Sequence, residues 1–477
     1  MRLALIYTPT FAENNWTAIR AQERNLGIIP PLSLLYVAAI AEQAGHQVII
    51  IDTVAQKLSV EDVISELEVF SPDILGFTMT TYMFHQALSW IREIKKRMNL
   101  PILIGGQHLG TYPKETMTHK EIDYAVVGEA EITLPQFFET LEKGKSLEGV
   151  NGLAFRQNGK TIFNSPQDKV MEIDKIPFPA RHLVDNAKYY NVVSRRKKFT
   201  AMVTTRGCPF HCIFCDLKKA KWRMRSPQNI ADEMEECYKD FGVREIDFYD
   251  SSFTANKQRV LEICKEIRQR KLDIIWSIRT RVDCVDKEML KELSRSGCVR
   301  IMFGIESADP EILKTLRKGI SVDQIRKIIA WTKEYNIEAL GFFIIGSPGE
   351  TRETAQKTIQ FACELPLDWV QFTKMTPFPA TELYQMMMED TGEDYWSSFV
   401  LNPANEKSLP LVRTRLTPLE AKQLVRQAYL KFYFRPKRIF PALKKMRSLN
   451  DFNKAFHAAL DTLILPPVTG DPILDST

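Results

Sequence analysis

The sequence predicts an α/β protein with two parallel sheets and a helical carboxyl-terminal region. In residues 1–145, and again in 199–385, short apolar runs alternate with longer segments of helical periodicity. Apolar runs separated by helices are typical of parallel strands in a sheet that is covered on both faces. Residues 146–198 and 386–477 lack this alternation; the first predicts a short hairpin at Gly152–Phe163 within a linker, and the second is rich in helical segments. We therefore expect four parts with these boundaries.

Five strand-like runs in residues 1–145 are each followed by a helical segment. The runs are Leu3–Tyr7, Val48–Ile51, Ile74–Phe77, Ile102–Ile104 and Tyr124–Val127, and the predicted helices are 31–44, 60–70, 84–98, 112–118 and 131–142. Five such units suit a flavodoxin-like (Rossmann-like) sheet, in which ligands bind beyond the carboxyl ends of the strands. The loops at those ends are Thr8–Gly27, Thr78–Met83, Gly105–Gly110 and Gly128–Glu131.

Six further units follow in residues 199–385. The strand-like runs are Ala201–Thr205, Glu245–Tyr249, Ile274–Ile278, Val299–Phe303, Ala339–Ile345 and Trp369–Thr373. Helices are predicted at 227–240, 256–270, 286–296, 309–335 with a break near Gly319, and 351–364. Six units are two fewer than a closed eightfold barrel contains, so we predict a partial (βα)6 TIM barrel with its ligands at the carboxyl ends of the strands.

The segment Arg206–Asp216 carries the clearest chemical signal. Its cysteines Cys208, Cys212 and Cys215 have C-x3-C-x2-C spacing and follow the first strand of the predicted barrel. Three thiolates on one loop can hold three irons of a [4Fe–4S] cluster and leave the fourth iron open to a small molecule. Phe214 can help to shield such a cluster from water. The alternatives are buried structural cysteines or a zinc site, although zinc usually takes four ligands.

With an aromatic residue before its last cysteine, this loop resembles the signature of radical S-adenosylmethionine (SAM) enzymes. The resemblance implies that SAM chelates the open iron and is cleaved reductively to methionine and a 5′-deoxyadenosyl radical. It also implies contacts to SAM after the second, third, fourth and fifth strands of an open six-unit barrel, from Asp250, Arg281, Glu306 and Gly346. One departure from the family pattern is Ala380, which stands where the usual P-x-P-G-T motif has glycine.

Residues 1–145 resemble the cobalamin-binding domain that precedes many radical SAM domains. The similar pieces are Pro30–Leu32, Gly105–His108 and Val127–Glu131. The resemblance implies cobalamin contacts from Thr78, Gly105, Gly106, Gln107, His108, Gly128 and Glu129. The D-x-H-x-x-G motif, which supplies a histidine to cobalt in mutases and methionine synthase, is absent from the sequence. We therefore expect Thr78–Thr81 to face cobalt without a histidine bond, and His108 to be either a loop residue against the corrin or a polar surface residue.

Composition excludes several other classes of protein. Of the 477 residues, 44% are apolar and 26% are charged, as in ordinary globular proteins. The net charge of +5 is too small to indicate nucleic-acid binding. No apolar run approaches the ~18 residues of a membrane span, and no signal peptide is recognisable, so we expect a cytoplasmic protein. The basic run Arg435–Arg447 after the amphipathic segment Pro418–Phe434 allows peripheral membrane contact, or a helix packed on the barrel mouth with a solvated face.

These patterns together predict a cobalamin-dependent radical SAM enzyme. The family includes methylases of carbon and phosphinate centres, and the anaerobic cyclase that forms the fifth ring of chlorophyll precursors. Methylation of an unactivated carbon or phosphinate in a small molecule or lipid is the preferred reaction, with a reducing partner such as flavodoxin or ferredoxin. The alternatives are a radical SAM enzyme with a vestigial B12 domain, a B12-dependent cyclase, and a non-catalytic iron–sulfur sensor. Methylthio transfer is disfavoured because the first domain contains no cysteine.

Overall fold

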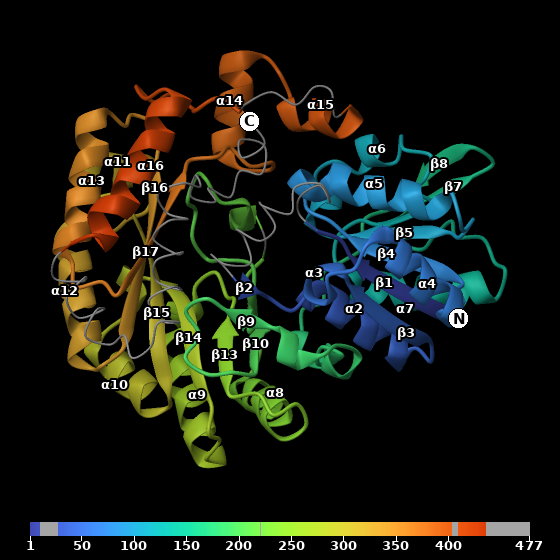
Figure 1. Ribbon diagram of the computed structural model, residues 1–477, viewed down its shortest axis with the longest axis horizontal. Helices are drawn as coiled ribbons and strands as arrows, with labels where there is room; N and C mark the ends of the chain where they lie inside the picture. Colours follow the sequence, from blue (N-terminus) through green and yellow to red (C-terminus); the bar gives the residue numbers. More distant parts are fainter. Residues whose placement is uncertain (10–26, 220, 403–408, 436–477) are drawn as a thin grey trace. The chain divides into compact units, whose positions relative to one another are not determined.

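The computed structural model describes residues 1–9, 27–219, 221–402 and 409–435. These residues form two compact units. The first unit contains Met1–Ala201 with two later segments, 239–243 and 394–402, and the second contains the other described residues. Each unit is built on one large sheet, with helices on its sides (Figure 1).

The first sheet has the predicted flavodoxin-like core. Its seven strands have the order β3-β1-β4-β5-β6-β7-β8, and β3, β1, β4, β5 and β6 are parallel. The strands are β1 (Arg2–Tyr7), β3 (Gln47–Asp52), β4 (Ile74–Thr78), β5 (Ile102–Gly105), β6 (Tyr124–Val126), β7 (Leu153–Gln157) and β8 (Lys160–Phe163). The predicted hairpin is the antiparallel pair β7–β8, and it extends this sheet beyond β6.

Strand β1 shows why this sheet reads as continuous apolar runs. Leu3 and Leu5 lie in one core cluster with helices α2 and α7, whereas Ala4 and Ile6, equally buried, alternate toward the opposite face. That face is covered by α4 and α5, which contact each other. The helices are α2 (Leu32–Gln43), α3 (Thr53–Gln56), α4 (Val60–Phe70), α5 (Phe84–Lys95), α6 (Pro113–Thr116) and α7 (Ala130–Glu142).

The second sheet is the predicted open six-stranded half-barrel. Its order is β10-β13-β14-β15-β16-β17, so each strand neighbours the next one in sequence. The strands are β10 (Phe199–Met202), β13 (Glu245–Phe248), β14 (Ile275–Arg281), β15 (Cys298–Glu306), β16 (Glu338–Ile345) and β17 (Trp369–Lys374). From β13 to β17 every neighbouring pair is parallel. The carboxyl ends of these strands therefore meet at one rim.

The helices of the second unit begin at polar capping residues. Asn256, Asp286 and Ser321 each accept a backbone N–H at the start of a helix, and Thr351 forms a capping box. The helices are α8 (Pro227–Lys239), α9 (Lys257–Arg270), α10 (Lys287–Arg295), α11 (Pro310–Thr315), α12 (Val322–Glu334) and α13 (Arg352–Glu364). The predicted break near Gly319 is the gap between α11 and α12, where Gly319 has a φ of +65°.

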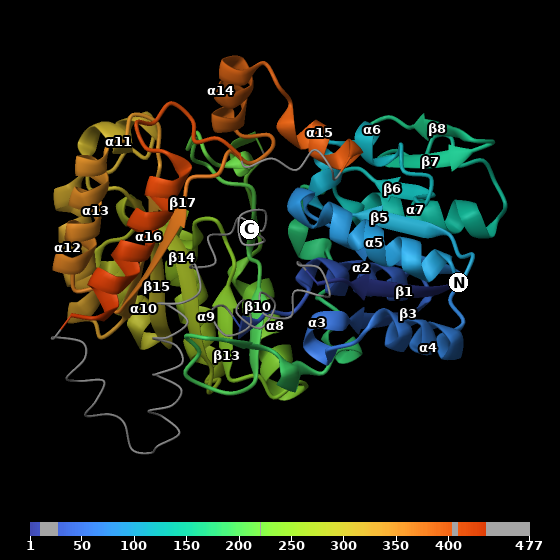
Figure 2. The ribbon, with the colours of Figure 1, turned by 45° about the horizontal axis from the view of Figure 1, so that its top comes forward.

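Three more helices follow the half-barrel: α14 (Glu382–Thr391), α15 (Tyr395–Leu401) and α16 (Pro418–Tyr433). Helix α16 lies along the last strand β17 and against α13, not on the barrel mouth as the sequence suggested (Figure 2). Its apolar face buries Leu424, Val425 and Phe432, whereas Leu419, in its first turn, is 65% exposed. The basic run after Arg435 lies outside the described residues.

Two tyrosines of α16 occupy the outer edge of β17. The Tyr429 hydroxyl donates to the carbonyl of Phe372 at 3.3 Å and accepts its N–H at 3.1 Å. The Tyr433 hydroxyl bonds both backbone groups of Val370 in the same way, at 3.2 and 3.3 Å. Four helical residues rise about 6 Å and two strand residues about 6.6 Å, so the spacings match. The two hydroxyls thus take the place of a seventh strand.

Helix α15 returns to the first unit. His85 and His119 bond the carbonyl oxygens of Phe399 and Val400, at the end of α15, the latter at 2.8 Å. The Ser397 hydroxyl donates to Glu115 at 3.0 Å. Polar partners for the last carbonyls of a helix satisfy groups that the helix itself leaves unpaired. Among the residues that the structure describes, no helix is both long and apolar enough to cross a membrane.

Candidate functional site

The cysteine loop leaves the rim of the half-barrel through a short ribbon. Strand β11 (Thr205–Arg206) pairs antiparallel with β12 (Arg223–Met224), so the segment 207–222 is closed at its base. Gly207 has a φ of +79°, a left-handed conformation that favours glycine, at the turn into the first cysteine. The ribbon and the turn at Gly207 thus place the three cysteines on a loop, not in a strand or helix.

The three thiols of this loop lie close enough to influence one another. Burial, with a smaller contribution from the neighbouring Cys212 thiol, raises the pKa of Cys208 and raises that of Cys215 to about 11. The N–H of Cys215 donates to the carbonyl of Cys212 at 3.3 Å. Within the described ranges, no three His, Cys, Asp or Glu side chains converge tightly enough to hold a single metal ion. Phe214, next to Cys215, is half-buried.

Arg281, at the carboxyl end of β14, reaches the cysteine loop. Its guanidinium stacks over the ring of Phe210 at 4.0 Å, and Nη1 donates to the Cys212 sulfur at 3.7 Å. The same group bonds both oxygens of Asp283, at 2.8 and 2.7 Å, and the carbonyl of Lys318. These contacts place a permanent positive charge beside one thiol of the loop.

Glu306 ends β15 next to this arginine and forms a buried ion pair. Its carboxylate lies 2.7 Å from Nζ of Lys318, and both side chains are almost fully buried. A Cβ on Gly304 would come within 2.6 Å of Glu306 Oε1 and 2.7 Å of Lys318 Nζ, so a larger residue there would shift the charged ends of the pair. Lys318 was not anticipated from the sequence, because its loop between α11 and α12 carries no motif. The structure thus brings Cys212, Arg281, Glu306 and Lys318 together.

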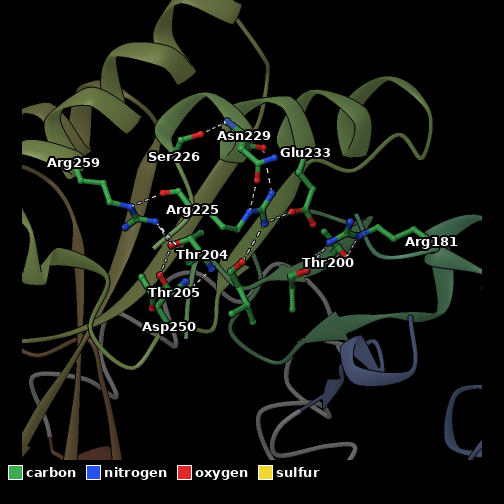
Figure 3. Close-up of polar contacts among 12 residues, drawn as sticks. Arg181, Thr200, Thr204, Thr205, Arg225, Ser226, Asn229, Glu233, Asp250 and Arg259 are labelled. Carbon is green, nitrogen blue, oxygen red and sulfur yellow. Dashed lines mark hydrogen bonds and ion pairs between the residues drawn. The ribbon is translucent and has the colours of Figure 1, made fainter. Parts of the chain in front are cut away.

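Asp250 follows β13 at the same rim but does not lie open to a ligand. Its side chain is 1% exposed, and Oδ1 accepts the N–H groups of Thr204 and Thr205 at 2.6 and 3.1 Å (Figure 3). The Thr204 hydroxyl donates to Oδ2. The expectation that Asp250 meets SAM is therefore at odds with its geometry: both oxygens are engaged with the stem of the cysteine loop. Burial raises the pKa of this carboxyl.

The Gly346–Glu350 loop follows β16. Gly346 has a φ of +95°, and a Cβ there would meet the Leu411 side chain at 2.9 Å. The buried Glu350 carboxylate accepts the N–H groups of Gly346 and Ser347, the latter at 3.1 Å, and so closes the loop on itself. Burial nevertheless raises the pKa of Glu350 to about 7, with a smaller contribution from Asp309.

The predicted crevice loops of the first sheet also lie side by side. Thr78 and Gly105 are register partners at the ends of β4 and β5, and Gly128 follows β6. A Cβ on Gly105 or Gly128 would meet no atom within 4 Å, whereas one on Gly106 would come within 2.5 Å of the Met79 carbonyl. Gly105 and Gly128 thus leave space at this edge, and Gly106 allows two loops to touch. Gln107 is exposed and Glu129 is half-buried beside them.

His108 is neither a polar surface residue nor a loop residue that lies open to a ligand. It is 1% exposed, and its ring nitrogens bond the hydroxyls of Thr81 at 3.1 Å and Thr116 at 2.8 Å. The ring also lies 4.8 Å from that of Phe84. Burial lowers the pKa of His108 to about 3, so the imidazole is neutral. It is a core histidine that ties the loop after β4 to α6, and both of its nitrogens are occupied.

Two buried hydroxyls at the same edge point to a polar ligand. The Oγ1 atoms of Thr8, after β1, and Thr80, after β4, have no hydrogen-bond partner among the described residues. Buried polar atoms are rarely left unpaired, so such atoms suggest a bound partner. Strands β1 and β4 flank the point where the strand order reverses, which is where ligands bind in such sheets. Beyond Pro9, the predicted loop Thr8–Gly27 lies outside the described residues until Gly27.

Two family models match the chain. Residues 202–362 match the model of the radical SAM superfamily, and residues 25–138 match that of the B12 binding domain. An uncharacterized methyltransferase of Pyrococcus horikoshii is 34% identical over 445 residues, which cover 92% of this chain and 93% of that protein. The anaerobic magnesium-protoporphyrin IX monomethyl ester cyclase of Rubrivivax gelatinosus is 28% identical over 75% of this chain and 66% of its own length.

A solved structure shares the fold of the chain. The cobalamin-dependent SAM radical enzyme OxsB, with aqua-cobalamin bound, aligns with a TM-score of 0.72 at 16% identity, over 99% of this chain and 74% of that one. The chain belongs to the radical SAM superfamily, among its members that carry a B12-binding domain. It is a radical SAM enzyme whose cofactors are a [4Fe–4S] cluster, SAM and cobalamin. Such enzymes act on a small-molecule substrate and need a reductant.

Proposed function

We propose that this enzyme is a cobalamin-dependent methyltransferase that acts on an unactivated carbon, or a phosphinate centre, of a small molecule or lipid. The observation that carries the proposal is the relative named a methyltransferase, which is 34% identical over nearly the full length of both chains. The cofactors supply the radical and methyl-transfer chemistry when bound; the protein positions them and excludes water.

The cluster ligands in this proposal are Cys208, Cys212 and Cys215. Three thiols that lie close together on one loop suit a four-iron cluster with one open iron, whereas zinc usually takes four ligands. The Arg281 guanidinium beside Cys212 suits a thiolate that carries negative charge. Glu306, with its partner Lys318, and Gly346 are the proposed SAM contacts at the rim.

The proposed cobalamin site is the edge formed by Thr78, Gly105, Gly106 and Gly128, with Gln107 and Glu129 beside it. The space at two of these glycines and the unpartnered hydroxyls of Thr8 and Thr80 support it. His108 is excluded as a cobalt ligand in this proposal, because Thr81 and Thr116 occupy its nitrogens. A lower face without a histidine bond would favour release of the methyl group.

The second candidate is a B12-dependent radical cyclase. The observation in its favour is the similarity to the magnesium-protoporphyrin ester cyclase, at 28% identity. If the B12 domain were vestigial, the purified protein would retain no corrinoid. If the protein were a non-catalytic iron–sulfur sensor, it would form no deoxyadenosine from SAM.

The deciding experiment uses SAM that carries a trideuterated methyl group. Anaerobically purified enzyme with cobalamin and reductant is incubated with cell extract, and products are followed by mass spectrometry. We expect deoxyadenosine together with metabolites that have gained the trideuterated methyl group. Deoxyadenosine without label in any metabolite would favour the cyclase, and the absence of deoxyadenosine would refute radical SAM activity.

The cysteine assignment has its own test within the same preparation. Alanine at Cys208, Cys212 and Cys215 together should abolish the [4Fe–4S] chromophore after reconstitution. Cys237, which is fully buried on α8, provides the matched control, and Cys237→Ala should retain the chromophore. A full-strength cluster in the triple variant would contradict the assignment.

We further propose a cytoplasmic enzyme whose electrons come from a flavodoxin or ferredoxin. None of the eight cysteines forms a disulfide in the structure, which suits a reducing compartment. The small net charge of +5 supports the absence of a nucleic-acid partner. Peripheral membrane contact through Arg435–Arg447 stays a proposal, since nearly all of that run lies outside the described residues. Reduction of the cluster by each carrier in anaerobic stopped-flow spectroscopy tests the electron source.

A further inference from the structure

Four buried charged side chains surround the stem of the cysteine loop (Figure 3). We call them the stem clamp: Asp250, Arg259, Arg225 and Glu233, with exposures of 1%, 6%, 6% and 0%. They come from the loop after β13, from α9, from the end of the ribbon and from α8. Of the four, only Asp250 was singled out in the sequence, and its side chain faces the stem.

Thr204, on the incoming stem, is the centre of the clamp. Its N–H donates to Asp250 at 2.6 Å, and its hydroxyl donates to Asp250 and accepts from Arg259 Nη2 at 2.8 Å. Its carbonyl accepts from Arg259 Nη2 at 3.0 Å and from the N–H of Arg225 at 3.0 Å. Every polar group of Thr204 is therefore bonded to the clamp.

Arg225, on the outgoing stem, is held from two sides. Its carbonyl accepts from Arg259 Nε at 2.9 Å, so one guanidinium bridges the two stems. Its own guanidinium bonds the carbonyl of Val203 at 3.1 Å, Oδ1 of Asn229 at 2.6 Å and the Glu233 carboxylate. The two stems are thus joined to each other through backbone carbonyls and fixed to α8 and α9 through side chains.

Such a network is not explained by stability alone. Buried ion pairs lose much of their attraction to desolvation, and apolar residues of the same size often stabilise a fold as well. A loop that must present three thiolates in one geometry would otherwise lose conformational entropy when the cluster binds, because each residue that becomes ordered loses backbone freedom. Fixing both ends beforehand removes part of that loss, as preorganisation does in other binding sites.

We propose that the stem clamp is a positioning device that presets the three thiolates for the cluster and slows loss of iron. The inference rests on the proposed function, in which the loop cysteines bind the cluster. It assigns Arg259 as the central positioning residue, because its guanidinium bonds a backbone carbonyl on each stem, those of Arg225 and Thr204.

The test compares loss of iron from reconstituted protein to a chelator, under anaerobic conditions, with the thermal unfolding of the cluster-free protein. Arg259→Gln and Asp250→Asn should each release iron about 10-fold faster than the wild type, the factor that corresponds to one buried hydrogen bond. Thr204→Val removes only a hydroxyl and should also speed the release of iron. It replaces the charge variants in the test if either of them fails to fold.

Arg270→Gln is the matched control. Arg270 lies on the same helix α9 and also pairs with α8, through Asp232 and Glu235 at 2.6 Å, but it bonds no described residue of the loop stems. It should destabilise the cluster-free protein as Arg259→Gln does, yet leave iron release unchanged. Release at the wild-type rate in Arg259→Gln and Thr204→Val, or equal acceleration in Arg270→Gln, would overturn the inference. A wild-type protein that takes up no cluster would instead refute the proposed function.

Discussion

Glu350 should make the stability of the enzyme depend on pH near neutrality. This carboxyl is 0% exposed and closes the loop after β16 through the N–H groups of Gly346 and Ser347. Its second oxygen, Oε1, has no hydrogen-bond partner among the described residues. Burial raises its pKa from 4.5 to about 7, in spite of the two N–H groups, which act in the opposite direction.

The sign and size of the effect follow from this shift. Between pH 4.5 and about 7 the folded protein keeps a proton that the unfolded chain has lost. The folded state therefore binds more protons there, and the free energy of unfolding falls as the pH rises. The contribution is fully present below pH 4.5 and is lost by about pH 7. A shift of this size corresponds to about 3 kcal/mol.

Replacing Glu350 by Gln removes the titration and keeps a side-chain oxygen for Gly346 and Ser347. Thermal unfolding midpoints of wild type and Glu350→Gln are measured from pH 5 to 8.5. The unfolding midpoint of Glu350→Gln should rise relative to that of the wild type as the pH rises, by about 2–4 °C for each kcal/mol of stability that the wild type loses. Any fixed loss from the buried amide is the same at every pH and does not affect this trend. Parallel profiles of the two proteins would refute the reasoning.

Three other predictions concern the ion pair, the sheet edge and the core histidine. Glu306→Ala leaves Lys318 without its carboxylate and should weaken SAM binding about 10-fold without loss of the cluster; unchanged affinity in calorimetry would remove Glu306 from the site. Tyr429→Phe combined with Tyr433→Phe should lower the free energy of unfolding in urea by about 2 kcal/mol, and no loss would mean that water replaces the hydroxyls. His108→Ala should leave the paramagnetic resonance of bound Co(II) cobalamin unchanged, whereas loss of a nitrogen splitting would show that His108 ligates cobalt.

Much of the fold followed from patterns that are local in sequence. Runs such as Leu3–Tyr7 report burial on both faces directly, and capping residues such as Thr351 mark where helices begin. The spacing of the three cysteines also sufficed to locate the loop. The hairpin at Gly152–Phe163 was predicted as well, but its pairing with β6 was not, because alternation identifies a hairpin without identifying its neighbour.

The parts that were missed depend on contacts between distant residues. Arg259 meets Thr204 across 55 positions, and no motif marks it. Asp250 follows a strand as predicted, yet position alone does not tell whether a side chain faces the ligand or the stem. His108 was expected near a surface or a ligand, but two threonine hydroxyls make its burial favourable. The sequence located Asp250 and His108 along the chain, but it did not predict the direction in which their side chains point.

The tyrosine-capped strand β17 has a consequence for how this half-barrel ends. An uncovered edge strand offers its N–H and C=O groups as a template, and a strand from another molecule can extend the sheet there. Hydroxyls accept and donate at that edge without presenting a new ladder of their own. Helix α16 therefore prevents another strand from pairing with β17. An open half-barrel can in this way end at six strands, with neither a seventh strand nor a closed circle.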